Sequence, residues 1–166
     1  MLQIAVLISG RGSNMLKLAE AIAADQLNAR IAIVISNQHC AGITNAADLG
    51  IQTKVIERRN FTTRRNHDRA IHDAITSSSV DYVFLAGYMA IFGDDFTTAF
   101  AGRLINIHPS LLPHFKGLDT HQRAIEAQAK YHGATVHLVT ADLDDGPIIL
   151  QAQLSILPED DADRLA

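Results

Sequence analysis

Hydrophobic residues along the chain form short continuous runs that alternate with stretches of helical spacing. A continuous apolar run bounded by glycine or polar residues is typical of a strand buried on both faces. The runs of this kind are Leu2–Ser9, Arg30–Ser36, Asp81–Ala86 and, more weakly, Gln52–Ile56. The stretches with apolar residues on one helical side are Ser13–Leu27, Ala41–Leu49 and Thr62–Ser78. This alternation predicts βαβ units, and therefore an α/β fold with a mostly parallel, Rossmann-like sheet flanked by helices.

The pattern changes in the second half of the chain. Leu104–His108 is a short predicted strand and Lys116–Tyr131 is predicted to be mostly helical, whereas Thr135–Thr140 and Ile148–Ile156 are strand-like. Along the last of these, apolar and polar residues alternate, which predicts one solvated face on an antiparallel or edge strand. The second half therefore predicts an antiparallel hairpin that follows the parallel sheet.

The 166 residues fit one domain. We divide it into a nucleotide- or phosphate-binding half, residues 1–100, and a second half, residues 101–166, which contains the candidate catalytic residues. Pro158 and the acids behind it have the composition of a helix start. Because the chain ends at Ala166, we expect that helix to continue in a longer parent protein, with a frayed natural terminus as the alternative.

Charge and composition narrow the function classes. The formal net charge of -4 gives no nucleic-acid footprint. The first apolar run is too short to span a membrane and lacks a basic leader. The single cysteine, Cys40, precludes an internal disulfide and suits a reducing compartment. We therefore expect a cytoplasmic protein without a membrane partner.

A glycine-rich loop, Ser9 to Asn14, lies between the first predicted strand and the first predicted helix. Backbone amides of Gly12, Ser13 and Asn14 at a helix start favour an anion such as phosphate. The alternative is a tight turn in which Ser13 caps the helix. Met15 occupies the third-glycine position of a dinucleotide fingerprint. A single phosphate on a small substrate therefore fits better than NAD or ATP.

Polar residues with catalytic capability cluster in the second half. Asn106 and His108 are two apart on a predicted strand, so they share one face. A hydrogen-bonded core histidine is an equally good interpretation of His108 taken alone. Asp144 lies in a turn between two predicted strands, where acids are usually only turn formers.

Taken together, three motifs resemble those of the folate-dependent formyltransferases. They are residues 106–113 (NIHPSLLP), residues 132–137 (HGATVH) with Asp144, Gly146 and Pro147 behind them, and residues 8–14 (ISGRGSN). The resemblance extends over the whole chain in order. Within the family, it is strongest to the members that formylate glycinamide ribonucleotide in purine synthesis.

The resemblance implies an activity and a set of site residues. It implies 10-formyltetrahydrofolate as co-substrate, glycinamide ribonucleotide as acceptor and no metal; a homodimer is left open. The catalytic residues would be Asn106, His108 and Asp144, and the substrate phosphate would bind to Gly12, Ser13 and Asn14. The folate contacts would be Arg64, Met89, Ala90, Ile91, Phe92, Asn106, Ala141, Asp142, Leu143 and Asp144. Residues 101–166 would then be the catalytic and folate-binding half.

Two positions depart from the family pattern. Ala90 stands where many members carry arginine, which removes a contact to the folate tail. Asp145 stands where glycine is common, and we expect it to add negative charge beside Asp144.

Other functions remain open at this point. Formyltetrahydrofolate hydrolase and methionyl-tRNA formyltransferase share the same three catalytic residues, although they usually carry an N-terminal regulatory domain and a basic C-terminal domain, respectively. A metal hydrolase is disfavoured because neither His67 with His72 nor His132 with His137 has convincing zinc spacing. A truncated, non-catalytic phosphate-binding module is the third alternative.

Overall fold

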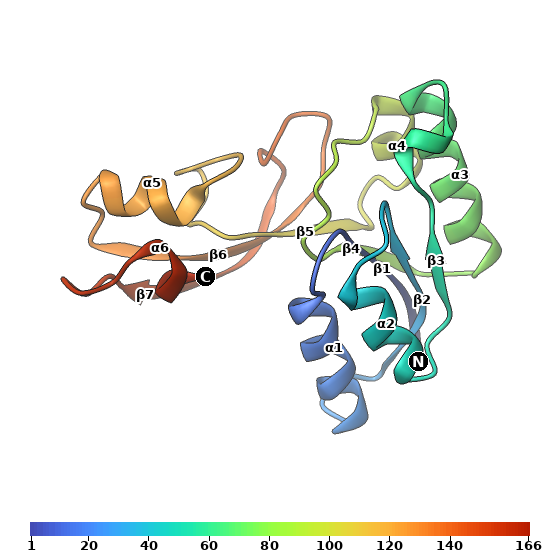
Figure 1. The fold of residues 1–166 in the computed structure, drawn as a ribbon, viewed down its shortest axis with the longest axis horizontal. Helices are drawn as coiled ribbons and strands as arrows, with labels where there is room; N and C mark the ends of the chain where they lie inside the picture. The colour runs from blue at the N-terminus through green and yellow to red at the C-terminus, as the bar shows by residue number, and fades with distance from the viewer. The chain divides into compact units, whose positions relative to one another are not determined.

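A computed structural model describes residues 1–166, which form two compact units, Met1–Leu104 and Ile105–Ala166. The first unit contains a parallel sheet in the order β3-β2-β1-β4 (Figure 1). Its strands are β1 (Leu2–Ile8), β2 (Ala29–Ser36), β3 (Thr53–Val55) and β4 (Tyr82–Leu85). Each matches a predicted apolar run to within two residues at either end. The parallel α/β architecture of this half is as predicted.

Five helical segments connect these strands. They are α1 (Ser13–Ala23), α2 (Ala41–Asp48), the short 3₁₀ helix η1 (Arg58–Asn60), α3 (Arg64–Ser77) and α4 (Asp94–Ala99). The predicted first helix is too long, because Asp25 adopts a φ of 53° and stops it. The sequence pattern gave no prediction for α4.

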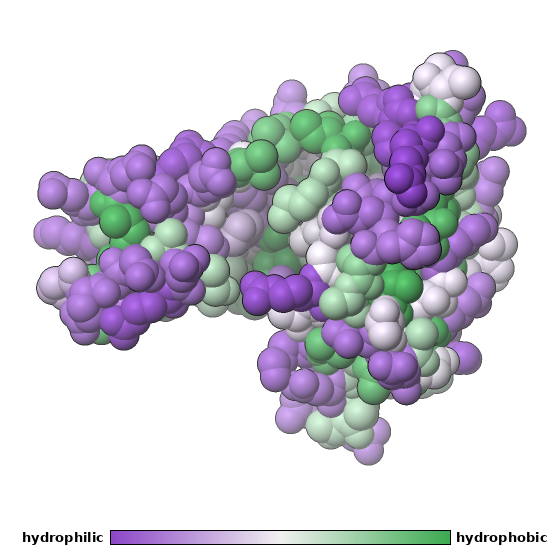
Figure 2. Space-filling view, viewed as in Figure 1, coloured by the Kyte–Doolittle hydropathy of each residue, from purple (hydrophilic) through white to green (hydrophobic).

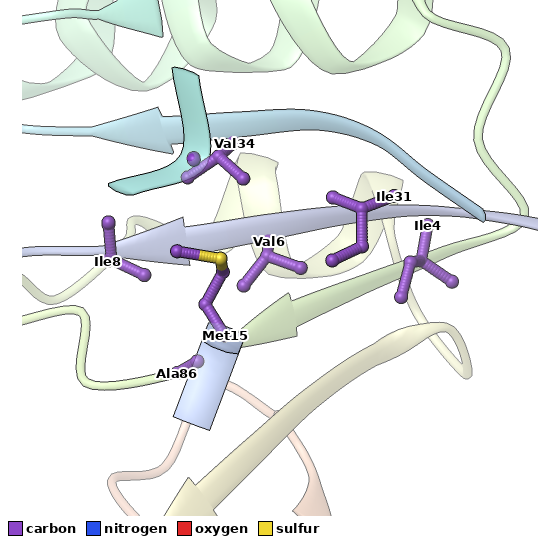
Figure 3. Packing of buried hydrophobic residues seen from close by; sticks show 8 residues of the cluster. Ile4, Val6, Ile8, Met15, Ile31, Val34 and Ala86 are labelled. Carbon is purple, nitrogen blue, oxygen red and sulfur yellow. The ribbon is translucent and has the colours of Figure 1, made fainter. Parts of the chain in front are cut away.

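The core of this unit explains why β1 is continuously apolar from Ile4 to Ile8. Ile4, Val6 and Ile8 alternate along β1 and pack with Met15 of α1, as Figure 3 shows. Ala5 and Leu7 point to the opposite face and are also fully buried. Because helices cover both faces of this strand, the residues on both faces are apolar. The alternation of apolar and polar residues found in a strand with one solvated face is therefore absent.

The second unit is antiparallel. It consists of β5 (Leu104–His108, whose first residue belongs to the other unit), α5 (Thr120–Glu126), β6 (Tyr131–Leu138), β7 (Ile148–Ser155) and α6 (Ala162–Leu165). β6 pairs antiparallel with both β5 and β7. The predicted C-terminal hairpin is therefore confirmed.

The predicted helix at Lys116–Tyr131 is wrong at both ends. α5 begins only at Thr120, and Tyr131 already belongs to β6. Gly117, Asp119 and Gln128 have positive φ values of 82°, 56° and 52°. Such left-handed residues cannot continue a right-handed helix. The helical spacing of the side chains in the sequence gave no indication of these left-handed backbone conformations.

The last strand is more exposed than predicted. Alternation predicted one solvated face, but every residue of β7 is exposed, including Ile149 at 53% and Leu150 at 63%. In the face seen in Figure 2, hydrophobic residues reach the surface among hydrophilic ones. The following helix begins at Ala162 rather than at Pro158, with Asp161 capping the amide of Arg164. No helix in the chain has the length and hydropathy needed to cross a membrane.

Candidate active site

The shared face predicted for Asn106 and His108 is confirmed by the pairing of β5 with β6. Asn106 lies opposite His137 and His108 lies opposite Thr135. Because directly opposed residues of antiparallel strands point to the same face, these four polar side chains gather on one side of the hairpin. Ile107 points to the other face, as its place between the polar pair predicts.

The imidazole of His108 meets the carboxylate of Asp144, as the resemblance implied. His108 Nδ1 lies 3.4 Å from Asp144 Oδ2, and the two side chains are only 6% and 9% exposed. His108 Nε2 lies 2.9 Å from the carbonyl oxygen of Phe115. Both ring nitrogens thus face oxygens that can only accept hydrogen bonds. A doubly protonated ring would direct one N–H towards each of these oxygens.

The loop that follows β5 also holds Asp144. The amide of Gly117 donates to Asp144 Oδ2 over 2.9 Å. Asp144 itself has a φ of 48°, a conformation that aspartate tolerates better than most residues. Gly146 allows the loop to return closely, since a Cβ there would overlap the carbonyl of Leu138. The carboxylate is therefore fixed by its own turn and by the facing loop.

The surroundings of Asp144 keep it ionised. Burial alone would raise the pKa of its carboxyl group. The hydrogen bond from His137, the amide of Gly117 and the charges of His108 and His137 outweigh burial, so the pKa is lowered from its usual 3.8. Asp144 is thus a stable counter-ion rather than a proton donor at neutral pH.

This lowered pKa predicts a pH-dependent contribution to stability. A carboxyl with a lower pKa in the folded chain stabilises the fold at pH above its unfolded value, and this contribution disappears as the pH falls through the folded pKa. The stability difference between the wild type and Asp144→Asn should therefore shrink as the pH falls below 3.8. Urea unfolding at a series of pH values measures it, and a difference constant with pH would contradict the assignment.

Thr135 holds the loop after β5 against the hairpin. Its fully buried hydroxyl donates to the carbonyl of Ser110 over 2.7 Å and accepts from the amide of Leu112 over 3.0 Å. Gln151 of β7 donates to the same oxygen over 2.9 Å. This hydroxyl thus bonds to two backbone groups of the loop that carries Phe115 and Gly117 to the site.

The charge expected beside Asp144 is compensated in the structure. Lys116 forms an ion pair with Asp145. The lysine belongs to the loop that donates to Asp144 through Gly117. Asp145 therefore contributes a surface ion pair between the two loops rather than an uncompensated negative charge.

In the first unit, the glycine loop has the geometry of an anion site. Gly12 adopts a φ of 73° and precedes α1 without any side-chain cap, so Ser13 does not act as the capping residue. The carbonyl oxygen of Gly12 also accepts the first hydrogen bond of the helix, from the amide of Leu16 over 2.9 Å. The first-turn amides of Ser13 and Asn14 have no partner inside the helix and carry the positive end of its dipole.

Close packing fixes the shape of this loop. The amide of Gly42, in the first turn of α2, donates to the carbonyl of Gly10 over 3.1 Å. A Cβ at Gly42 would lie 2.7 Å from that carbonyl oxygen and 2.5 Å from Ile8 Cδ1. Position 42 therefore accepts only glycine unless the loop moves.

Ser9 joins the glycine loop to the segment after β4. Its amide donates to the carbonyl of Gly87 over 3.0 Å, and its hydroxyl accepts from the amide of Met89 over 2.8 Å. This junction lies where the strand order reverses between β1 and β4, the usual ligand position in such sheets. The predicted phosphate loop and the start of the predicted folate segment are thus neighbours.

The remaining predicted folate positions differ in exposure. Met89 and Ile91 are 68% and 63% exposed, and Ala90 is exposed too. The side chain of Phe92 is buried and stacks on Tyr88 and Phe96, so it serves packing. Arg64 begins α3 and lines a cavity of about 570 Å³ with residues of α3 and α4. On the β6–β7 loop, the residues Ala141, Asp142 and Leu143 are exposed.

Sequence reasoning considered His137 only as an unconvincing metal ligand and missed its place in the site. Its buried ring contacts both Asn106 and Asp144. The available signal was its spacing of two from Thr135 on the same predicted strand, which puts both side chains on one face. His132 instead pairs with His121 over 2.8 Å, and no three His, Cys, Asp or Glu residues are grouped to hold a metal ion.

Comparison with known proteins shows the family of the chain. Residues 2–166 match the family model described as formyl transferase. Phosphoribosylglycinamide formyltransferase of Haemophilus influenzae is 46% identical over 99% of this chain and 78% of its own length. The Escherichia coli enzyme of the same name is 40% identical over equal shares. The crystal structure of glycinamide ribonucleotide transformylase 1 from Symbiobacterium toebii, 38% identical, superimposes with a TM-score of 0.96 over 99% of this chain and 78% of that one. The chain belongs to the formyl transferase family.

Proposed function

We propose that this protein transfers the formyl group of 10-formyltetrahydrofolate to the amine of glycinamide ribonucleotide, a step of purine synthesis. The observation that carries the proposal is the buried cluster of Asn106, His108 and Asp144, in which His108 has an acceptor at each ring nitrogen. The relatives that bear the corresponding names add support over nearly the whole chain.

The chemistry follows from this cluster. The substrate amine attacks the formyl carbon, and a tetrahedral intermediate with a negatively charged oxygen forms. The His108 imidazolium would stabilise that oxygen through its charge, and its Nε2 proton would have to turn from the carbonyl of Phe115 to the folate nitrogen as the carbon–nitrogen bond breaks. The attacking amine loses a proton, and transfer of that proton to the neutral His108 ring restores the imidazolium. Asp144 supplies a negative charge opposite that imidazolium, with Oδ2 3.4 Å from His108 Nδ1.

Asn106 would donate an amide N–H to the same oxygen. Loss of one such donor costs about 10²- to 10³-fold in turnover. In the structure, the nitrogen of the Asn106 side chain is directed at His137 and Asp144, at 3.1 and 3.5 Å. The donor role therefore depends on how the amide is turned.

The glycine loop would hold the phosphate of the acceptor substrate. The amides of Ser13 and Asn14 and the dipole of α1 attract an anion without a basic side chain. This suits a chain whose net charge is -4, since no broad positive field steers the ligand.

We expect Gly42→Ala to raise the KM for glycinamide ribonucleotide by about tenfold or more, roughly the loss of one charge-assisted hydrogen bond. The added Cβ would contact the carbonyl of Gly10 at 2.7 Å and displace the loop amides. Steady-state kinetics measures the effect. Gly50→Ala is the control for general destabilisation, because its φ of 71° strains an alanine while no atom lies within 4 Å of the added Cβ. An unchanged KM in Gly42→Ala would contradict the loop assignment.

The proposed activity is tested by following deformylation of 10-formyltetrahydrofolate by the purified protein. We expect product formation to require glycinamide ribonucleotide and to be negligible with water alone or with methionyl-tRNA. Conversion that is independent of the ribonucleotide would instead identify a hydrolase, and conversion with the charged tRNA alone would identify the tRNA formyltransferase activity.

A further inference from the structure

The amide of Asn106 is held by the protein on its nitrogen side. Asn106 Nδ2 lies 3.1 Å from His137 Nε2 and 3.5 Å from Asp144 Oδ1. If each contact takes one hydrogen, neither N–H is left for a ligand, and the amide oxygen is the free atom. An oxygen acceptor there would repel the charge that develops during formyl transfer.

The surroundings of His137 restrict where its protons lie. The ring is 2% exposed, and Nδ1 lies 2.9 Å from the carbonyl oxygen of Leu138, which can only accept. Nδ1 therefore carries a hydrogen, and the only variable proton of the ring is on Nε2. That atom faces the Asn106 amide and lies 3.7 Å from Asp144 Oδ1.

The proton on Nε2 decides how the Asn106 amide is turned. A neutral His137 accepts at Nε2, so the amide nitrogen must face it. A protonated His137 donates at Nε2, so the amide oxygen must face it and the nitrogen turns away with both hydrogens free. The two orientations differ by a half-turn of an amide whose oxygen and nitrogen are nearly the same size, so the half-turn changes hydrogen bonding far more than packing.

The charged groups around the ring bear on this choice. Asp144 is the nearest, with its Oδ1 3.7 Å from His137 Nε2. His108 shares the same carboxylate from the other side, at 3.4 Å from Oδ2. Lys116 and Asp145 form an ion pair next along the loop. Oδ2 of Asp144 thus faces the His108 ring, and Oδ1 faces the His137 ring.

We propose that His137 is a positioning residue for formyl transfer, which turns the Asn106 amide through Nε2 so that its N–H groups face the formyl oxygen. The inference rests on the proposed function. His137 acts through Asn106, because each of its ring nitrogens is directed at a protein atom.

The first test is kinetic. His137→Leu should lower kcat by about 10²-fold, the cost of one lost oxyanion donor, with KM values little changed. His137→Gln should retain most of kcat, because its terminal amide can donate to the Asn106 oxygen, and its kcat should lose the pH dependence that the His137 ring contributes. In an Asn106→Ala background, His137→Leu should have almost no further effect. Urea unfolding confirms that each variant is folded.

Equal losses from His137→Leu in the two backgrounds would overturn the proposal, as would a rise in KM without loss of kcat. The second test does not depend on turnover. In ¹⁵N-labelled protein, the side-chain NH₂ signals of Asn106, identified by their loss in Asn106→Ala, should shift as the His137 ring titrates and should lose that shift in His137→Gln. Asn106 signals that do not shift during this titration would refute the coupling between the His137 ring and the Asn106 amide. If the wild type shows this coupling but does not transfer a formyl group, only the proposed function is refuted.

Discussion

Replacing Asp144 with asparagine is expected to lower kcat by about 10²- to 10⁴-fold, the usual range for a disabled acid–base group. Asparagine keeps the shape of the side chain but removes the charge opposite His108 Nδ1, at 3.4 Å. The new amide can donate to Nδ1, while Nε2 still donates to the carbonyl of Phe115. The ring is then neutral and no longer stabilises the oxyanion. Steady-state rates across the pH range measure both the loss and the changed profile.

Asp145→Asn is the matched control, because it makes the same chemical change one residue along the turn. Asp145 is 56% exposed and paired with Lys116, and a surface pair of this kind contributes only about 0–1 kcal/mol. Its kcat should stay within a few-fold of the wild type. If the two variants lose activity equally, the effect belongs to the loop as a whole and the counter-ion role of Asp144 is wrong.

The largest expected loss of stability is in Thr135→Val, at roughly 2–5 kcal/mol. Valine has nearly the same volume as threonine but lacks the hydroxyl that bonds to Ser110, Leu112 and Gln151. The buried carbonyl and amide of the loop would be left without partners, and each unpaired group costs about 1–3 kcal/mol. Urea unfolding at neutral pH measures the change in free energy.

Thr135→Ser separates the hydroxyl from packing. Serine retains the oxygen and loses one buried methyl, so we expect a loss of about 1 kcal/mol. The valine variant should therefore be clearly less stable than the serine variant. The reverse order would mean that the methyl group, rather than the hydrogen bonds, holds the loop.

The elements that were predicted well from the sequence have one property in common: their hydrophobic residues are the residues that are buried in the structure. β5 occupies the residues expected, Leu104–His108, and its two polar side chains share a face. Helix ends were predicted less well, because they depend on backbone conformation. At Asp25 and Asp119, a positive φ ends or delays a helix although the side-chain spacing continues.

The resemblance named Asn106, His108 and Asp144, which meet in the structure, but not the groups that hold them. Lys116, which neutralises Asp145, is 29 residues away from it in the chain. Gly117 donates to Asp144 through its backbone amide. A glycine has no side chain that could indicate such a contact in the sequence. Contacts of this kind depend on which loops meet, and hydrophobic periodicity carries no information about that.

By itself, the sequence determined the α/β class, the strand runs, the glycine loop and the polar face of β5, because burial and backbone sterics act locally along the chain. The tertiary structure alone decided that Asp144 lies against His108, that Thr135 fixes the loop between them, and that His137 contacts the Asn106 amide. These contacts join residues far apart in sequence, and they form only when β5, β6 and the two loops pack together. Their distances and proton positions, on which the proposed chemistry depends, are properties of that packing.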